Sequence, residues 1–173
     1  SRMLFDKPNV SGSYSIETAS GSVFNVVGEV NGMYSDKTEV SERLARTSEA
    51  NTRTLNQSED EYNFEIGVDY DMAFGAGRLK LLGLHRFESS PTEDRTRIAA
   101  VNGDLEGSVF QRQADEAESI VRAEFAFTAL DSQWRWSLEG TENYLDIDSQ
   151  LDRLDAQGAL TPVDLGGASA RVE

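Results

Sequence analysis

The sequence predicts an all-β protein, an antiparallel up-and-down meander of about six or seven long strands that forms a segment of a transmembrane β-barrel. Three observations lead to this fold class. Apolar and polar residues alternate with a period of two over several long stretches. Short and long connections alternate along the chain, and aromatic residues collect toward the ends of the alternating stretches.

The clearest alternation runs from Tyr62 to Phe74, where the even positions are apolar and the odd positions are mostly polar. Gly75-Ala76 then fits the two-residue loop of a type II′ hairpin, and the apolar positions continue at odd numbers from Leu79 to Phe87. This loop fixes the register, because a slip of one residue would set apolar side chains against polar ones. The pairs expected are Phe74 with Gly77, Asp71 with Lys80, Glu65 with Arg86 and Phe64 with Phe87.

The same alternation predicts three hairpins in all, at about 9–35, 61–89 and 116–145. The stretches between and after them are polar and show no sustained period, so we predict long loops at 36–60, 89–115 and 146–164. Strand extensions remain an alternative at the two roots of the first loop and, in the second, at Arg95–Val101 and Ser108–Gln111. In outer-membrane barrels the periplasmic turns are short and the extracellular loops are long, which matches this alternation. Residues 1–173 then form one partial β-barrel domain.

Composition excludes several other classes. The formal net charge of −15 argues against nucleic acid as a partner, because phosphates would be repelled. The chain has no cysteine, so neither a disulfide framework nor a zinc site with sulfur ligands is expected. No stretch has the apolar length of a transmembrane helix, whereas a barrel strand needs apolar residues at only every second position.

In a barrel, the strand-end aromatic residues would form girdles at the two membrane interfaces. They are Tyr34, Tyr62, Phe74, Phe87, Trp134 and Tyr144. The charged positions of the polar face would line the lumen, where they could border a substrate path or pair with one another. They are Glu29, Asp69, Arg122, Glu124, Arg135 and Glu139.

No catalytic or cofactor-binding residue is predicted. His85 is the only histidine. It shares the apolar face of its own strand with Leu79, Leu81, Gly83 and Phe87, which offer neither a nucleophile nor an orienting group, so we expect a girdle residue at a strand end. Four aspartates could supply oxygen ligands to Ca²⁺, but they lack the glycine and terminal glutamate of an EF-hand loop. We therefore expect a solvated loop and no metal site at Asp146, Asp148, Asp152 and Asp155.

Three segments resemble the barrel of TonB-dependent outer-membrane receptors. They are Phe74-Gly75-Ala76-Gly77-Arg78-Leu79-Lys80-Leu81-Leu82-Gly83-Leu84-His85-Arg86-Phe87-Glu88-Ser89, Gln113-Ala114-Asp115-Glu116-Ala117-Glu118 and Trp134-Arg135-Trp136-Ser137-Leu138-Glu139-Gly140. In such receptors a short periplasmic turn leads into a strand of the form GRLKL.GL.R. The resemblance runs from about Asn9 onward.

The resemblance implies energy-coupled uptake of a scarce nutrient, such as a ferric siderophore or another metal chelate, across the outer membrane of a Gram-negative bacterium. It implies as partners the outer-membrane lipid, the rest of the barrel and its plug, and TonB, which would contact an N-terminal part outside these residues. The chain would be a piece of such a receptor, without the plug, the TonB-contacting box or the terminal aromatic strand. The alternative is a soluble or secreted β-sheet binding module of the adhesin kind.

Overall fold

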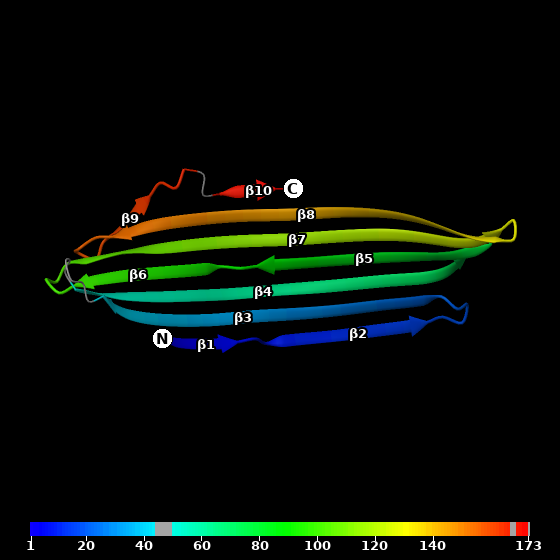
Figure 1. Cartoon of the computed structure of the whole chain (residues 1–173). Helices are drawn as coiled ribbons and strands as arrows, with labels where there is room; N and C mark the ends of the chain where they lie inside the picture. The colour runs from blue at the N-terminus through cyan, green and yellow to red at the C-terminus, as the bar shows by residue number, and fades with distance from the viewer. Residues whose placement is uncertain (44–49, 167–168, 173) are drawn as a thin grey trace.

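A computed structural model describes residues 1–43, 50–166 and 169–172. All secondary structure in this part of the chain is β, and ten antiparallel strands form one sheet (Figure 1). No helix that is long and apolar enough to cross a membrane occurs among these residues. The all-β antiparallel meander predicted from the sequence is therefore confirmed.

The strands follow one another across the sheet almost in chain order, with the two termini at opposite edges (Figure 1). Their bounds are β1 Arg2–Asp6, β2 Asn9–Glu17, β3 Val23–Arg43, β4 Asn51–Phe74, β5 Gly77–Ser89, β6 Thr92–Ala100, β7 Leu105–Ala129, β8 Ser132–Leu154, β9 Leu160–Val163 and β10 Ala170–Val172.

The ten strands make seven rows, which agrees with the predicted six or seven. The strands β1 and β2 both pair with β3, β5 and β6 lie together between β4 and β7, and β9 and β10 both pair with β8. Proline causes two of the breaks within rows, because Pro8 and Pro91 have no N–H to donate to a neighbour. Their carbonyls still accept bonds from Gly32 and Asp60, at 2.9 and 3.2 Å, so the register continues unchanged through each break.

The predicted register of the central hairpin is confirmed. Phe74 pairs with Gly77, and the same register sets Asp71 opposite Lys80, Glu65 opposite Arg86 and Phe64 opposite Phe87. Gly75 has φ +57° and Ala76 has no positive φ, which is the pattern of a type II′ turn. Glycine is the residue that adopts this backbone conformation without a steric penalty.

The predicted loops 36–60, 89–115 and 146–164 are wrong over most of their length. Strand β3 continues to Arg43 and β4 begins at Asn51, with all twenty-one residue pairs from Val23–Asp71 to Arg43–Asn51 in one register. Residues 89–115 contain β6 and the start of β7, and residues 146–164 contain the end of β8 and β9. Both faces of these parts are mostly polar, with only scattered apolar residues such as Val109 and Leu154, so the strands show no sustained hydrophobic period. Part of the first predicted loop, residues 44–49, lies outside the described residues.

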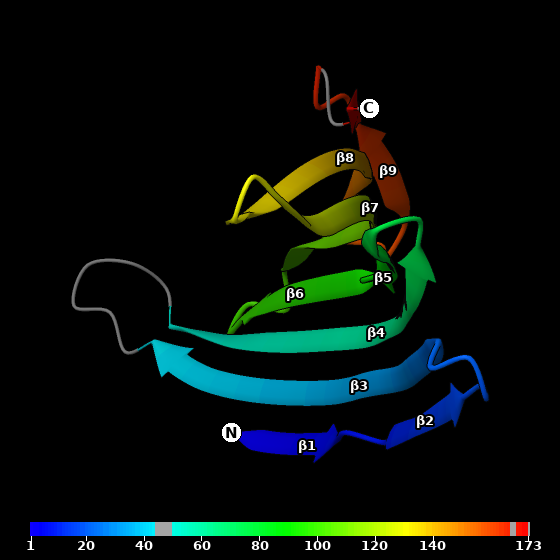
Figure 2. The same cartoon turned by 90° about the vertical axis from the view of Figure 1, so that its right-hand side faces the viewer.

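The sheet is a single curved and twisted layer rather than one half of a packed core (Figure 2). Val109 and Ala114 are the only buried apolar residues in the described part of the chain, and no large side chain there is fully buried. Stable domains normally bury an apolar face against a second layer. Within the described residues, neither face of this sheet is buried against a second layer.

Candidate functional site

The main chemical feature of the sheet is an apolar band on one of its faces. Cross-strand pairing places the apolar alternating positions of six neighbouring rows on the same side, since paired residues share a face. Many of these side chains are exposed, including Val121 at 64%, Trp136 at 64% and Leu138 at 77%. The other exposed large members are Val10, Tyr14, Ile16, Phe24, Val30, Tyr62, Ile66, Val68, Phe74, Leu81 and Trp134.

The apolar band has a defined length along the strands. On β4 it extends over the eleven residues from Phe64 to Phe74, a distance of ten steps or about 33 Å at the rise of a β-strand. Strands tilted by roughly 40° would bring this length to a height of about 25 Å, the height of the apolar band on outer-membrane barrels.

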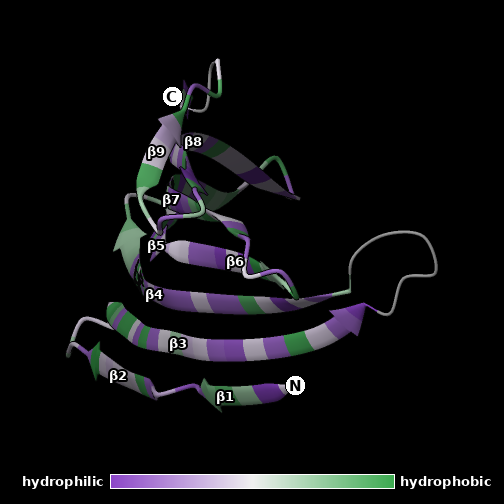
Figure 3. Ribbon diagram, turned by 90° about the vertical axis from the view of Figure 1, so that its left-hand side faces the viewer, coloured by the Kyte–Doolittle hydropathy of each residue, from purple (hydrophilic) through white to green (hydrophobic). Residues whose placement is uncertain are grey.

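Beyond the band, the same face becomes mostly polar, apart from a small apolar cluster of Leu105, Val109, Leu154 and Leu160. We call these parts the strand extensions: residues 35–43, 51–60, 92–100, 105–114 and 147–154. On β4 the face changes from Tyr62 and Phe64 to Asp60, Ser58, Asn56 and Thr54. In Figure 3 the arrowhead end of β3 is mostly purple, whereas its beginning alternates between green and purple. The extensions are therefore suited to water on both faces.

Aromatic contacts lie at both ends of the apolar band. At the end near the extensions, Phe87 packs against Tyr62 and Phe64, with ring centroids 5.9 and 5.8 Å apart. At the end near the short turns, Phe125 packs against Phe74 and Phe127 at 6.0 and 5.2 Å, and Phe127 meets Trp136 edge-on at 5.4 Å. Four of the six predicted girdle residues, Tyr62, Phe74, Phe87 and Trp134, belong to these two ends. Tyr144 is level with Phe87, and Tyr34 lies just beyond that level.

The opposite face of the same strands, which we call the charged face, carries the predicted charged residues. Residues that pair in turn across neighbouring strands form what we call a cross-strand line. Asp69, Arg122 and Glu139 lie on one such line, together with Asn25 and Leu82. Arg122 Nε donates to Glu139 Oε2 at 2.6 Å, and Asn25 donates to both carboxylate oxygens of Asp69 at 3.0 and 3.1 Å.

The remaining predicted charged residues also lie on this face. Arg122 lies 3.5 Å from Glu124, and Asn9 donates to Glu29 at 2.7 Å. Arg135 is opposite Ala126 on the same face. Pairing between neighbours, one of the two roles expected of these charges, is thus what the structure displays for Arg122, Glu124 and Glu139.

Two hollows lie side by side on the charged face. The acidic hollow, of about 460 Å³, is lined among others by Glu29, Glu65, Glu88, Glu116 and Glu118. The apolar hollow, of about 680 Å³, has Val27, Gly67, Leu82, Leu84 and Ile120 in its lining. The apolar hollow is not evident from the sequence, because Leu82 and Leu84 fall at positions of the polar alternation.

His85 has a polar neighbour that its own strand does not reveal. Its Nδ1 lies 2.9 Å from the hydroxyl of Ser119 on β7, and Glu142 of β8 is opposite Ser119. The expectation of apolar neighbours, which considered its own strand alone, is therefore incomplete. The carboxylate of Glu142 thus neighbours the serine, whereas in a catalytic triad the carboxylate hydrogen-bonds to the histidine and orients it. Ile66 is the residue opposite His85 on its other side.

Three of the four aspartates considered as calcium ligands do not lie in a loop. Asp146, Asp148 and Asp152 are part of β8, where an extended backbone spaces them out, so the expected solvated loop is wrong for these three. Asp155 accepts the backbone N–H groups of Gln157 and Ala159 at 3.0 and 2.8 Å in the following turn. No group of three or more potential ligands placed to hold a metal ion is present among the described residues.

No family model matches the chain, and no curated protein sequence matches it.

Proposed function

We propose that this chain is part of the membrane-spanning barrel of a TonB-dependent receptor in the outer membrane of a Gram-negative bacterium. The observation that carries the proposal is the apolar band, exposed on one side of a single-layer sheet while the other side is charged. Exposed apolar patches of this extent occur on proteins that meet lipid or another apolar partner. Water on the charged side and lipid on the apolar side is the environment of a barrel wall.

The rest of the architecture supports the same environment. The strands are long, up to the twenty-five residues of β7, so they extend past the band into water. The two edge rows, β1 with β2 and β9 with β10, each pair on one side only within the described residues. Further strands of the receptor would pair with these edges, because a barrel spanning a membrane leaves no open edge.

The receptor class rests on the resemblance of three segments to TonB-dependent receptors: the β4–β5 turn with β5, residues 113–118 in the middle of β7, and residues 134–140 near the start of β8. Its function would be energy-coupled uptake of a scarce nutrient, with a ferric siderophore as the first compound to test. The plug and the TonB contact would lie in other parts of the receptor.

The two tryptophans provide a direct test of the membrane-facing assignment. Trp134 and Trp136 both lie on the apolar face, at the short-turn end. After reconstitution into vesicles, phosphatidylcholine with brominated acyl chains should quench their fluorescence strongly, and acrylamide in the buffer should quench it weakly. A chain that stays monomeric without detergent, with tryptophans open to acrylamide, would instead be a soluble binding module.

The transport assignment needs a separate measurement. Deleting the gene in its host should abolish energy-dependent uptake of the nutrient, and loss of TonB should give the same defect. Uptake of labelled ferric siderophores under iron restriction is the first assay. A deletion strain that retains the uptake of every siderophore and other scarce nutrient its parent takes up would contradict the receptor proposal, even if the membrane assignment holds.

A further inference from the structure

The apolar hollow on the charged face has no role in a sheet that simply separates lipid from water. Val27, Gly67, Leu84 and Ile120 lie on one cross-strand line, and Val27 is 50% exposed. Gly67 has no side chain, which leaves space between Val27 and Leu84. A Cβ at this position would come within 3.1 Å of Val27 and 3.9 Å of Leu84. An apolar patch framed by charged residues is typical of a binding surface.

The acidic hollow begins on the next cross-strand line. Glu29 is directly opposite Glu65 there, and on the following line Glu88 is directly opposite Glu116. Like charges facing each other across a strand pair are destabilising. Arg86, the one cation lining this hollow among the described residues, is opposite Glu65 on the first of these lines and lies 3.5 Å from Glu118, so one cation stands among five glutamates. A cationic partner placed at these two lines would relieve the repulsion.

The spacing of the three lines indicates the form of that partner. Successive lines are two residues apart along each strand, which is about 7 Å. An extended polypeptide places alternate side chains on one side with the same step. We propose that the charged face binds an extended segment of a separate polypeptide with the pattern apolar-x-Lys/Arg-x-Lys/Arg. The apolar side chain enters the apolar hollow, and the two cations reach the Glu29–Glu65 and Glu88–Glu116 lines.

A labelled pentapeptide tests this surface directly, and the test does not depend on where the protein resides. The probe is acetyl-Leu-Ser-Lys-Ser-Lys-amide with a fluorophore, titrated with the full chain in non-ionic detergent micelles at low salt, with anisotropy as the readout. Binding should be saturable. It should weaken about tenfold or more in Leu84→Ser and in the double variant Glu65→Gln/Glu116→Gln. The control Glu42→Gln, on the strand extension of β3, should bind within about twofold of the parent chain.

A charge reversal keeps the test decisive if a variant folds poorly. All variants are compared at equal β-sheet circular dichroism, and Glu65→Lys should shift preference toward acetyl-Leu-Ser-Glu-Ser-Glu-amide. If the parent chain binds acetyl-Ser-Ser-Lys-Ser-Lys-amide as tightly as the leucine peptide, the role of the apolar hollow is overturned. Equal binding of lysine amide alone would identify a small cation rather than a polypeptide as the occupant. The absence of saturable binding to the folded chain would overturn the proposal entirely.

Discussion

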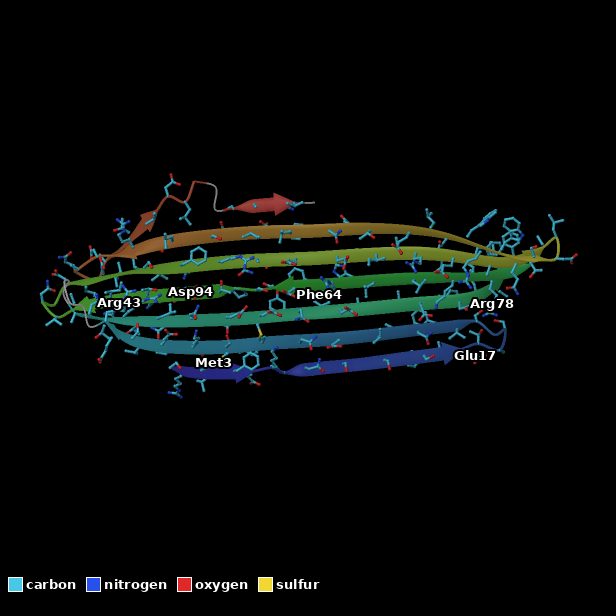
Figure 4. The ribbon with its side chains drawn as sticks, viewed as in Figure 1. Met3, Glu17, Arg43, Phe64, Arg78 and Asp94 are labelled. Atoms are coloured by element: carbon cyan, nitrogen blue, oxygen red, sulfur yellow. The ribbon has the colours of Figure 1, made fainter. Side chains whose placement is uncertain are left out.

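Arg78 on β5 holds Asp71 on β4 in an ion pair of 2.7 Å, although Lys80 is the residue directly opposite Asp71. Arg78 Nε also donates to the same carboxylate oxygen at 2.9 Å, and Nη2 donates to the carbonyl of Gly21 at 3.3 Å. The planar guanidinium can reach both acceptors, which a lysine ammonium on its single stem cannot do with the same geometry. Arg78 therefore links the β2–β3 turn to the central hairpin, near the short turns (Figure 4).

This contact predicts unequal effects for the two cations of β5. Arg78→Ala should destabilise the chain more than Lys80→Ala, and by no more than about 1 kcal/mol because the pair is exposed to solvent and salt. Urea unfolding in micelles, followed by tryptophan fluorescence, measures both. A double-mutant cycle with Asp71→Ala should assign the coupling to Arg78. Coupling of Asp71 to Lys80 of equal size would contradict the geometry.

The β7–β8 turn predicts a stabilising change. Ala129 pairs with Ser132, and the two loop residues between them, Leu130 and Asp131, both have positive φ, at 52° and 56°. These are the angles of a type I′ turn, which favours Asn-Gly, and a left-handed conformation costs a residue such as leucine about 1–2 kcal/mol. The double variant Leu130→Asn/Asp131→Gly should therefore raise the urea midpoint.

The matched control for that turn is the turn of the central hairpin. Gly75 already suits its positive φ, so Gly75→Ala should lower the urea midpoint although the space around it is open. A rise in both variants, or in neither, would argue against the assigned turn conformations.

The central hairpin was predictable because two independent signals agree there. The alternation requires an even-to-odd change of the apolar positions, and Gly75 supplies the positive φ of a two-residue turn. Together they leave one register, in which Val68 pairs with Gly83 and Asp69 with Leu82. The same alternation in the other two hairpins predicts the apolar band on one face of the sheet.

The strand extensions were not predictable by that rule. Thr52, Thr54 and Asn56 of β4 alternate with Arg53 and Leu55, so neither face is apolar and the sequence shows no period. These residues are held as strand by backbone pairing with β3 and β6, which continues the register of the band. The His85–Ser119 contact was missed for a related reason, since it joins residues thirty-four positions apart on different strands.

The assignment of the two faces predicts opposite responses at neighbouring positions of β4. Val68 is 41% exposed on the apolar face, and Asp69 is on the charged face. In the proposed receptor, Val68→Arg should impair membrane assembly by about 2–4 kcal/mol near the midplane. Asp69→Ala should assemble normally. Folding into vesicles, read from heat-modifiable gel mobility, compares the two, and equal assembly would refute the lipid-facing assignment.

The last prediction concerns the two ends of the strands. The β4–β5 and β6–β7 turns lie at opposite ends of the sheet (Figure 1). Gly75 and Gly103 stand in these turns, both with positive φ and with open space around them, so each should accept an inserted epitope tag. In outer-membrane barrels the short turns face the periplasm and the longer parts of the strands extend outward. A tag at Gly103 should therefore bind antibody on intact cells.

The tag at Gly75 is the matched control, and it should bind antibody only after the outer membrane is permeabilised. Equal total amounts of the two tagged proteins, measured on denaturing gels, separate exposure from expression. Labelling of Gly75 but not Gly103 on intact cells would invert the topology. Labelling of both on intact cells would mean that the chain does not span the membrane, because the strands that join these turns would then lie on one side of it.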